Sequence, residues 1–253
     1  MSDATASPTQ QTIMIRPARD ARDLAVCVEL QQSIWGYSAT DTVPEQIFIV
    51  AKKTGGQFLV ACDGEKAIGF ALAFAAMRGD GSYLHSHMVG VLQEYQDRGV
   101  GRLLKLEQRA DATVRGIDLI EWTFDPLQLK NARFNIARLG AIVRRYLPNL
   151  YGRTSSPLHA GLPTDRLVAE WWVRSPRVEA LLSGKPRVFI PGCERVVIPA
   201  AIREICRSDP RAAERIQSVV REQFEKHFSN GRAAVGFEFN EDLGCYLLEP
   251  YED

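Results

Sequence analysis

Residues Gln96–Arg102, with the sequence QDRGVGR, decide the fold of this chain. They follow an apolar run that ends near Val91 and begin a segment whose apolar residues recur every three or four positions, closed by Gly116. That spacing predicts an amphipathic helix. Glycines let backbone N–H groups approach an anion closely, and a helix start adds unpaired donors and the positive end of the helix dipole. The stretch therefore predicts a pyrophosphate site, unless its glycines serve only to pack the helix tightly on a sheet.

Two commoner nucleotide-binding motifs do not fit this stretch. The six-position glycine fingerprint of dinucleotide-binding folds has a different spacing and follows the first strand of a βα unit. A P-loop requires a lysine followed by serine or threonine, and residues 96–102 contain neither pair. Nucleoside triphosphate chemistry is therefore not expected.

Upstream of the glycines, the pattern predicts two helices and four strands. Asp20 to Trp35 is a helix stopped by Gly36, and a second helix begins near Val43-Pro44 and ends at Gly55-Gly56. The Asp63-Gly64 pair is typical of a hairpin turn. The strands are expected at residues 13–17, 57–62, 66–76 and 82–91, the last three as an antiparallel meander.

Downstream, strands are predicted at residues 118–124, 141–147 and 166–173, with a short helix at 131–139 stopped by Gly140. A meander combined with parallel crossovers predicts an α/β protein of the α+β type, with a mixed, mostly antiparallel sheet flanked by helices. Beyond residue 175, Gly and Pro mark loops before a helix at 210–228 and a hairpin at 233–248. We expect a disordered tail (1–12), a main domain (13–174) and a C-terminal α/β extension (175–253).

Composition narrows the classes of function. The 253 residues carry 31 Lys and Arg against 31 Asp and Glu, so no overall charge favours nucleic acid or an anionic membrane. Five scattered cysteines without a C-x-x-C pair indicate reduced thiols. Residues 1–12 lack the basic start and apolar core of a signal peptide, and no apolar run reaches membrane-spanning length. We expect a cytoplasmic protein that binds neither nucleic acid nor membrane.

The order of elements and residues 96–102 resemble the GNAT acyltransferase superfamily. Its pattern Q/R-x-x-G-x-G/A, after the fourth strand, is matched at Gln96, Gly99 and Gly101. The resemblance covers residues 13–174 and implies an acyl-CoA-dependent N-acyltransferase, with acetyl-CoA or another acyl-CoA as cosubstrate and no metal. The chain looks like a long bacterial group within the superfamily, marked here by Trp35-Gly36, His85–Met88, Trp122–Pro126, Asn131 and Tyr151-Gly152.

The resemblance also implies where the cosubstrate binds, along a strand end, the glycine loop and one asparagine. Gly90 supports the strand end independently, because glycine within a strand suggests a bulge or a close approach by another group. A bulge would free an N–H to polarise a thioester carbonyl, whereas the alternative is an ordinary core glycine. The residues expected to bind the cosubstrate are Met88, Val89, Gly90, Val91, Gln96, Asp97, Arg98, Gly99, Val100, Gly101, Arg102 and Asn131.

Acyl transfer to an amine requires a base, and two histidines are candidates. His85 and His87 alternate along one face of the predicted strand, and imidazole titrates near neutral pH. Either could accept the amine proton, or both could be hydrogen-bonded structural residues. A zinc site is the weaker alternative, because no Cys or carboxylate adjoins the pair to complete the ligand shell.

The proton donor to the leaving thiolate is harder to assign. Many superfamily members have a tyrosine in the helix after the fifth strand, where this chain has Ile136. Tyr146 and Tyr151 are candidate substitutes, although aromatic packing is the commoner role of such residues. Solvent could also protonate the thiolate, whose proton affinity is modest.

Fewer residues of the sequence point to the site that binds the acceptor. Trp35 and Glu45 lie where superfamily members often shape the acceptor pocket, and Asp125 either caps a turn or binds the incoming ammonium. Arg144 and Arg145 either attract a carboxylate or form a solvated pair.

By resemblance, the acceptor is a small amine or an amino acid and the donor group is acetyl or succinyl. Attack on the thioester is direct, because no Cys-His or Ser-His nucleophile pair is indicated. The alternatives are a non-catalytic acyl-CoA-binding module and a protein N-acetyltransferase. A homodimer is compatible with each of these interpretations.

Overall fold

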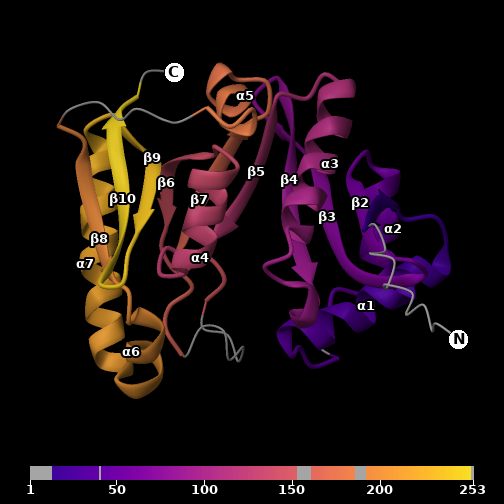
Figure 1. Cartoon of the computed structure of the whole chain (residues 1–253), viewed down its shortest axis with the longest axis horizontal. Coiled ribbons are helices and arrows are strands. Elements are labelled where there is room, and N and C mark those ends of the chain that lie inside the picture. The colour runs from indigo at the N-terminus through magenta and orange to yellow at the C-terminus, as the bar shows by residue number, and fades with distance from the viewer. Residues whose placement is uncertain (1–12, 40, 153–160, 186–191, 252–253) are drawn as a thin grey trace, which may run out of the picture. The chain divides into compact units, whose positions relative to one another are not determined.

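The computed structural model describes residues 13–39, 41–152, 161–185 and 192–251 (Figure 1). The chain forms two compact units, each described here by itself. The first unit comprises Met1–Phe74 and Met88–Gln108, and the second comprises Ala75–His87 and Arg109–Asp253. Three elements contribute residues to both units: β3 (Lys66–Arg78), β4 (Gly81–Val91) and α3 (Val100–Val114).

The first unit has four neighbouring strands in the order β1-β2-β3-β4. β1 (Met14–Pro17) pairs antiparallel with β2 (Gln57–Asp63), which pairs antiparallel with β3. The helices are α1 (Ala21–Trp35) and α2 (Glu45–Lys53), and the 3-10 turn η1 (Gln93–Tyr95) follows β4. These elements confirm the prediction for the N-terminal half.

Local chemistry explains the bounds of α1. The side chain of Asp20 accepts hydrogen bonds from the backbone N–H groups of Arg22 and Asp23, which caps the helix start. Gly36 ends the helix in the left-handed region, at φ 67°, where a side chain would be strained.

Two apolar clusters place the helices of the first unit on its strands. Leu30 and Phe48, from α1 and α2, share a buried cluster with Phe70 of β3. Val100 and Leu104 of α3 lie in a separate cluster with other strand residues. α1 and α2 therefore cover one face of these strands, and α3 covers the other.

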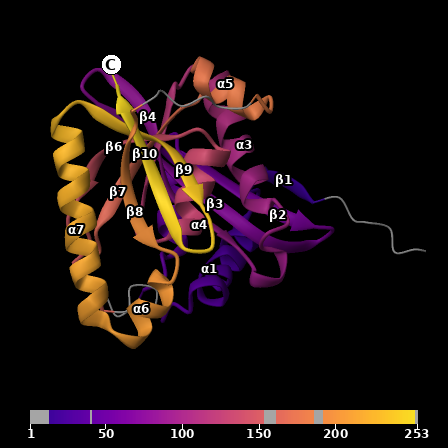
Figure 2. The same cartoon turned by 60° about the vertical axis from the view of Figure 1, so that its left-hand side comes forward.

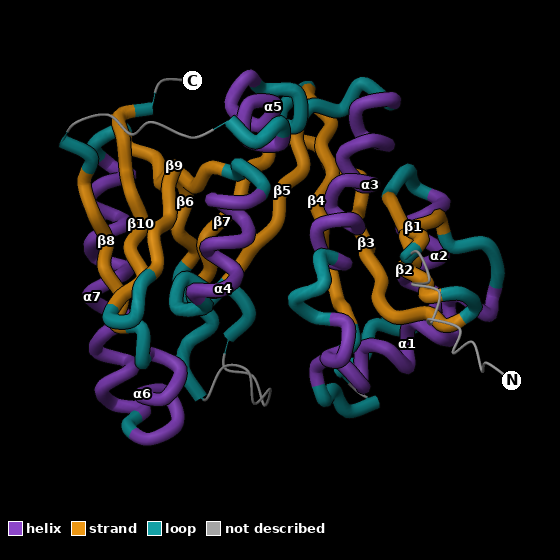
Figure 3. Tube along the Cα trace, viewed as in Figure 1, coloured by secondary structure: helices purple, strands orange, loops and turns teal. Residues whose placement is uncertain are grey.

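The second unit has the strand order β4-β5-β7-β6-β9-β10-β8, in which β4 and β5 are parallel and the pairs from β5 to β8 are antiparallel. The parallel pair β4–β5 among antiparallel pairs confirms the predicted mixed, mostly antiparallel sheet, and helices flank the strands (Figure 3). The remaining elements are β5 (Leu119–Phe124), α4 (Leu129–Ala132), η2 (Arg133–Arg138), β6 (Ile142–Leu147), β7 (Arg166–Trp172), α5 (Pro176–Leu182), β8 (Glu194–Pro199), α6 (Ile202–Ser208), α7 (Pro210–Ser229), β9 (Arg232–Phe239) and β10 (Leu243–Pro250).

The structure differs from the sequence prediction at two places. The helix predicted at 131–139 is the short α4 followed by η2, a widened π-helical turn. The segment predicted as loops after residue 175 contains α5, β8 and α6. Ser175 caps the start of α5, because its hydroxyl accepts a hydrogen bond from the N–H of Val178, and proline occupies the first turn. The predicted tail, residues 1–12, lies outside the described residues.

The last elements extend the sheet of the second unit. β6 pairs with β9 at Val143 and Ala234, and α7 packs against β6, β8 and β9 (Figure 2). Phe224 of α7 contacts Tyr146 and Tyr246, at ring-centroid distances of 5.9 and 5.0 Å. The predicted C-terminal helix and hairpin are confirmed, and they complete a core with β6.

All five cysteines lie in the described residues and none is in a disulfide bond. None of the helices in the part of the chain that the structure describes has the length and apolar character of a membrane span.

Candidate active site

The glycine loop of the first unit adopts the backbone conformation that its sequence suggested. Asp97 and Gly99 have φ values of 59° and 83°, in the left-handed region that favours glycine and tolerates aspartate. The N–H of Leu103 donates to the carbonyl oxygen of Gly99 at 3.0 Å, so α3 begins directly after this glycine. The N–H groups of the first helical turn have no partner within the helix and are available to an anion.

The surroundings of the glycines decide between packing and ligand binding. A Cβ atom added at Gly99 or Gly101 would have no other protein atom within 4 Å, whereas one at Gly56 would lie 2.2 Å from the carbonyl oxygen of Ala73. The interpretation that both loop glycines serve only helix packing is therefore wrong. Gly99 is explained by its positive φ. Gly101 has neither that conformation nor a close neighbour, and open space lies in front of its backbone.

Side chains around the loop fix its position. The amide of Gln96 donates to the carbonyl oxygen of Val91 at 3.1 Å, which ties the loop to the end of β4. The guanidinium of Arg98 lies over the ring of Tyr95, 5.2 Å from its centroid, and the hydroxyl of Tyr95 donates to Asp63 at 2.8 Å. The Gln96 bond is a positioning contact that sequence spacing alone did not suggest.

Gly90 in β4 is approached closely by side chains of α1. A Cβ at this position would lie 3.0 Å from Ile34 Cδ1 and 3.0 Å from the indole ring of Trp35. Trp35 also contacts Tyr37 and Phe70, with ring centroids 5.4 and 5.7 Å away. The close approach inferred from the sequence is confirmed, and the approaching group is Trp35, which lies against the Met88–Val91 backbone.

Two other residues that were predicted to lie at the site are exposed to solvent. Glu45 is the exposed first residue of α2 in the first unit. Asn131 is exposed in α4 of the second unit.

The histidines lie on β4 in the second unit. His85 is half-buried, His87 is exposed, and their ring centroids are 6.4 Å apart. Ser86 between them is buried, as strand alternation predicts. Partial desolvation by the surrounding protein, with a smaller contribution from His85, lowers the pKa of His87 below its usual value. A lowered pKa favours the neutral imidazole, which is the form that can accept a proton.

Of the three candidate positions for the acid, Tyr151 is exposed, with its hydroxyl 3.3 Å from Thr123 Oγ1, whereas the other two offer no readily available proton. Ile136 is fully buried in η2. The hydroxyl of Tyr146 donates to Asp165 Oδ2 at 2.7 Å, and burial together with this bond raises its pKa far above the usual value. These properties suit a structural role for Tyr146.

Asp125 caps a turn in the second unit. Its Oδ1 accepts from the N–H of Leu127 at 2.8 Å, which confirms the capping interpretation. Burial raises the pKa of its carboxyl group despite this hydrogen bond.

The sequence did not predict a cluster of ion pairs on the sheet of the second unit. Arg144 donates to Glu170 at 2.7 Å, and Arg145 donates to both Glu170 and Glu121. The interpretation of Arg144 and Arg145 as a solvated pair is therefore wrong. Both partners are buried glutamates on apolar strands, and no spacing in the sequence marks them as partners of the arginines.

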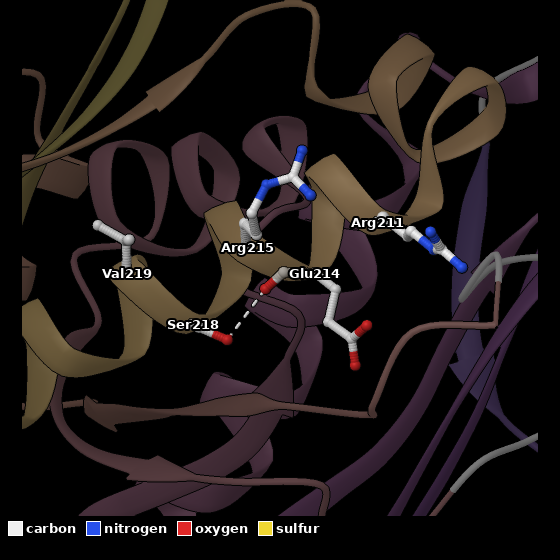
Figure 4. Close-up of a pocket in the computed structure, with 5 residues that line it drawn as sticks. All are labelled: Arg211, Glu214, Arg215, Ser218 and Val219. Atoms are coloured by element: carbon white, nitrogen blue, oxygen red, sulfur yellow. Dashed lines mark hydrogen bonds between the residues drawn. The ribbon is translucent and has the colours of Figure 1, made fainter.

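Two surface hollows contain none of the predicted site residues. One, of about 630 Å³, lies along α7 and is bordered by Arg211, Glu214, Arg215, Ser218 and Val219 (Figure 4). The other, of about 500 Å³, lies between the start of α1 and α2 in the first unit. The described residues contain no group of three or more His, Cys, Asp or Glu that could hold a metal ion.

Comparisons with known proteins agree with this geometry. Residues 24–140 match the family model described as "Acetyltransferase (GNAT) family". A search of curated proteins gives no match.

Among solved structures, the ribosomal-protein-S18-alanine N-acetyltransferase from Escherichia coli has a TM-score of 0.52 at 15% identity, over 70% of this chain and 100% of that chain. Arabidopsis thaliana NAA60 in complex with acetyl-CoA has a TM-score of 0.52 at 16% identity, over 64% and 99% of the two chains. At these identities the two structures show a shared fold.

The fold and the matched region define an acyltransferase domain. Residues 24–140 belong to the GNAT acetyltransferase family. The matched family is one of acetyltransferase enzymes.

Proposed function

We propose that this enzyme transfers an acetyl or succinyl group from its acyl-CoA to the amine of a small molecule or amino acid, by direct attack on the thioester. The observation that supports this most is the open start of α3. Gly101 is required neither by packing nor by a positive φ, and it lies in the first turn, where the N–H groups point out of the helix. A pyrophosphate is the anion that this arrangement suits best.

The cosubstrate is held along the strand end and the loop. Residues Gln96–Arg102 bind the pyrophosphate through backbone N–H groups, with the exposed Arg98 and Arg102 supplying positive charge. Met88–Val91 lies beside the pantetheine arm, and the family's pattern also assigns Asn131 to this arm. These assignments carry the family's pattern onto the matching positions of this chain.

The chemistry is assigned to the histidines of β4. His87, or His85 beside it, accepts the proton of the attacking amine, and the lowered pKa of His87 favours the neutral form that can do so. A backbone N–H near Gly90 stabilises the negative charge that develops on the thioester oxygen. Water protonates the leaving thiolate, because the hydroxyl of Tyr146 is engaged in a hydrogen bond to Asp165. The family's pattern assigns Trp35 and Glu45 to the acceptor pocket.

The test is release of the coenzyme A thiol from acetyl-CoA and from succinyl-CoA, with small amines, amino acids and peptides with free N-termini as acceptors. Turnover on small amines or amino acids, with peptides inactive, is the expected result. Turnover on peptides alone would instead identify a protein N-acetyltransferase. Tight binding of coenzyme A without turnover on any acceptor would identify a binding module and refute the proposal.

A further inference from the structure

Two buried glutamates face each other on neighbouring strands of the second unit. Glu121 of β5 and Glu170 of β7 are directly paired in the antiparallel register, and their side chains are 7% and 1% exposed. Like charges directly opposite each other are destabilising, and a buried carboxylate is costly without a partner. Something must therefore compensate these two charges.

Three arginines supply that compensation. Glu121 Oε2 accepts hydrogen bonds from the Nη2 atoms of Arg78 and Arg145. Glu170 accepts from Arg145 Nε at 3.4 Å and from Arg144 Nη2 at 2.7 Å. Three arginines therefore surround the two buried carboxylates.

A shift in strand register brings the adjacent arginines to one face. Val143 pairs with Ala169 and Arg145 pairs with Val168, so Arg144 is the extra residue of a bulge in β6. Neighbouring residues in a regular strand point to opposite faces, and a bulge removes that constraint. Arg144 and Arg145 can therefore both reach Glu170.

Two of the three arginines reach the surface. The side chains of Arg78 and Arg145 are 42% and 41% exposed, although both are bound to the buried Glu121. Arg78 also lies over the ring of Tyr83, 5.1 Å from its centroid. A guanidinium carries five N–H donors in a planar fork that matches a carboxylate. Because Glu121 fixes both guanidinium groups, less side-chain freedom is lost when an anion binds.

This cluster of glutamates and arginines lies next to the proposed base. His85 is the parallel partner of Glu121, and neighbouring strands lie about 4.8 Å apart with paired side chains on the same face. We propose that Arg78 and Arg145 bind a carboxylate of the acceptor, so that the enzyme acylates amines that also carry a carboxylate, such as amino acids. This inference rests on the proposed acyl transfer.

The test compares each amino acid with its carboxamide, which keeps the amine and loses the carboxylate's charge. We expect the wild-type enzyme to have a KM at least about tenfold lower for the acid than for the amide, as removal of one charged hydrogen-bond partner predicts. Equal KM values for acid and amide would overturn the carboxylate site while leaving acyl transfer intact.

Arg78→Lys and Arg145→Lys keep the charge beside Glu121 but remove the planar fork. Each should raise the KM for the acid about tenfold and leave that for the amide unchanged. The matched control is Arg174→Lys, an arginine of the same unit with a 48% exposed side chain, paired with the exposed Asp118. A purely structural network would change melting temperature and affect acid and amide equally, which would also overturn the inference.

A binding measurement keeps the inference testable if no amine is acylated, the outcome that refutes the proposed function. N-acetyl amino acids carry the carboxylate without a nucleophilic amine, and their carboxamides are the controls. Titration of the full chain by calorimetry should show binding of the acids, with at least about tenfold weaker binding in Arg78→Lys. Failure of the wild type to bind any of the acids would refute the carboxylate site.

Discussion

Replacing Gly101 with alanine should stabilise the protein and weaken its binding of coenzyme A at the same time. The new methyl group would have no other protein atom within 4 Å, and Gly101 is not in the left-handed region. Alanine is favoured over glycine within a helix by about 0.5–1 kcal/mol, so the free energy of unfolding should rise by up to that amount.

The binding loss follows from the same open space. A methyl group at Gly101 would occupy the approach to the N–H groups of the first turn of α3. The loss of one hydrogen bond to a charged group costs about 1.5–3 kcal/mol, which corresponds to a roughly tenfold to hundredfold weaker dissociation constant. The two effects of this substitution therefore have opposite signs.

Urea unfolding and calorimetric titration with coenzyme A would measure the two effects. Gly81→Ala is a suitable control, because a Cβ there makes only an ordinary contact, 3.5 Å from the carbonyl oxygen of Arg78. An unchanged dissociation constant for Gly101→Ala would refute the helix start as the pyrophosphate site. A loss of stability would contradict the open space in front of Gly101.

Three further substitutions test the remaining assignments. His87→Gln should lower kcat/KM about a hundredfold with coenzyme A binding intact. Because the pKa of His87 is lowered, the activity of the wild type should persist below pH 6.5 and decline only as the imidazole is protonated. A pH profile that the substitution leaves unchanged would exclude His87 as the base. Gly90→Ala should destabilise the protein by about 1–3 kcal/mol in thermal unfolding, and the same substitution should cost less in a variant that already lacks the Trp35 ring. Full stability of Gly90→Ala would contradict the close contact. Tyr146→Phe should cost about 1–3 kcal/mol of stability with kcat unchanged, because Asp165 loses a buried donor, whereas a lower kcat at full stability would return Tyr146 to the mechanism.

Features encoded by local chemistry were predictable from the sequence. Asp20 and Gly36 mark the ends of α1 through backbone contacts within a few residues. Gly99 needs its left-handed conformation whatever the rest of the chain does. Helix limits and the glycine loop could therefore be read from short windows of sequence.

Features that depend on strand register were not predictable. The partners of Arg145 are set by the pairing of β5 with β7 and β7 with β6, including one extra residue at Arg144. A shift of one residue would move these side chains to the other face, and no local signal fixes that choice. The burial of Glu121 and Glu170 follows from the same register. β8 was missed because it is a short strand among loops, stabilised by pairing with β10.

The strands added beyond β6 have a consequence for solubility. With β9 beside it, β6 is an interior strand, and the outermost strand of the second unit is β8. An outermost strand presents unpaired N–H and C=O groups on which another chain can assemble, and charges or proline hinder this. β8 begins with Glu194 and Arg195 and ends at Pro199, whereas β6 begins with Ile142 and Val143. A version of the chain shortened to end after β7 should therefore aggregate through β6.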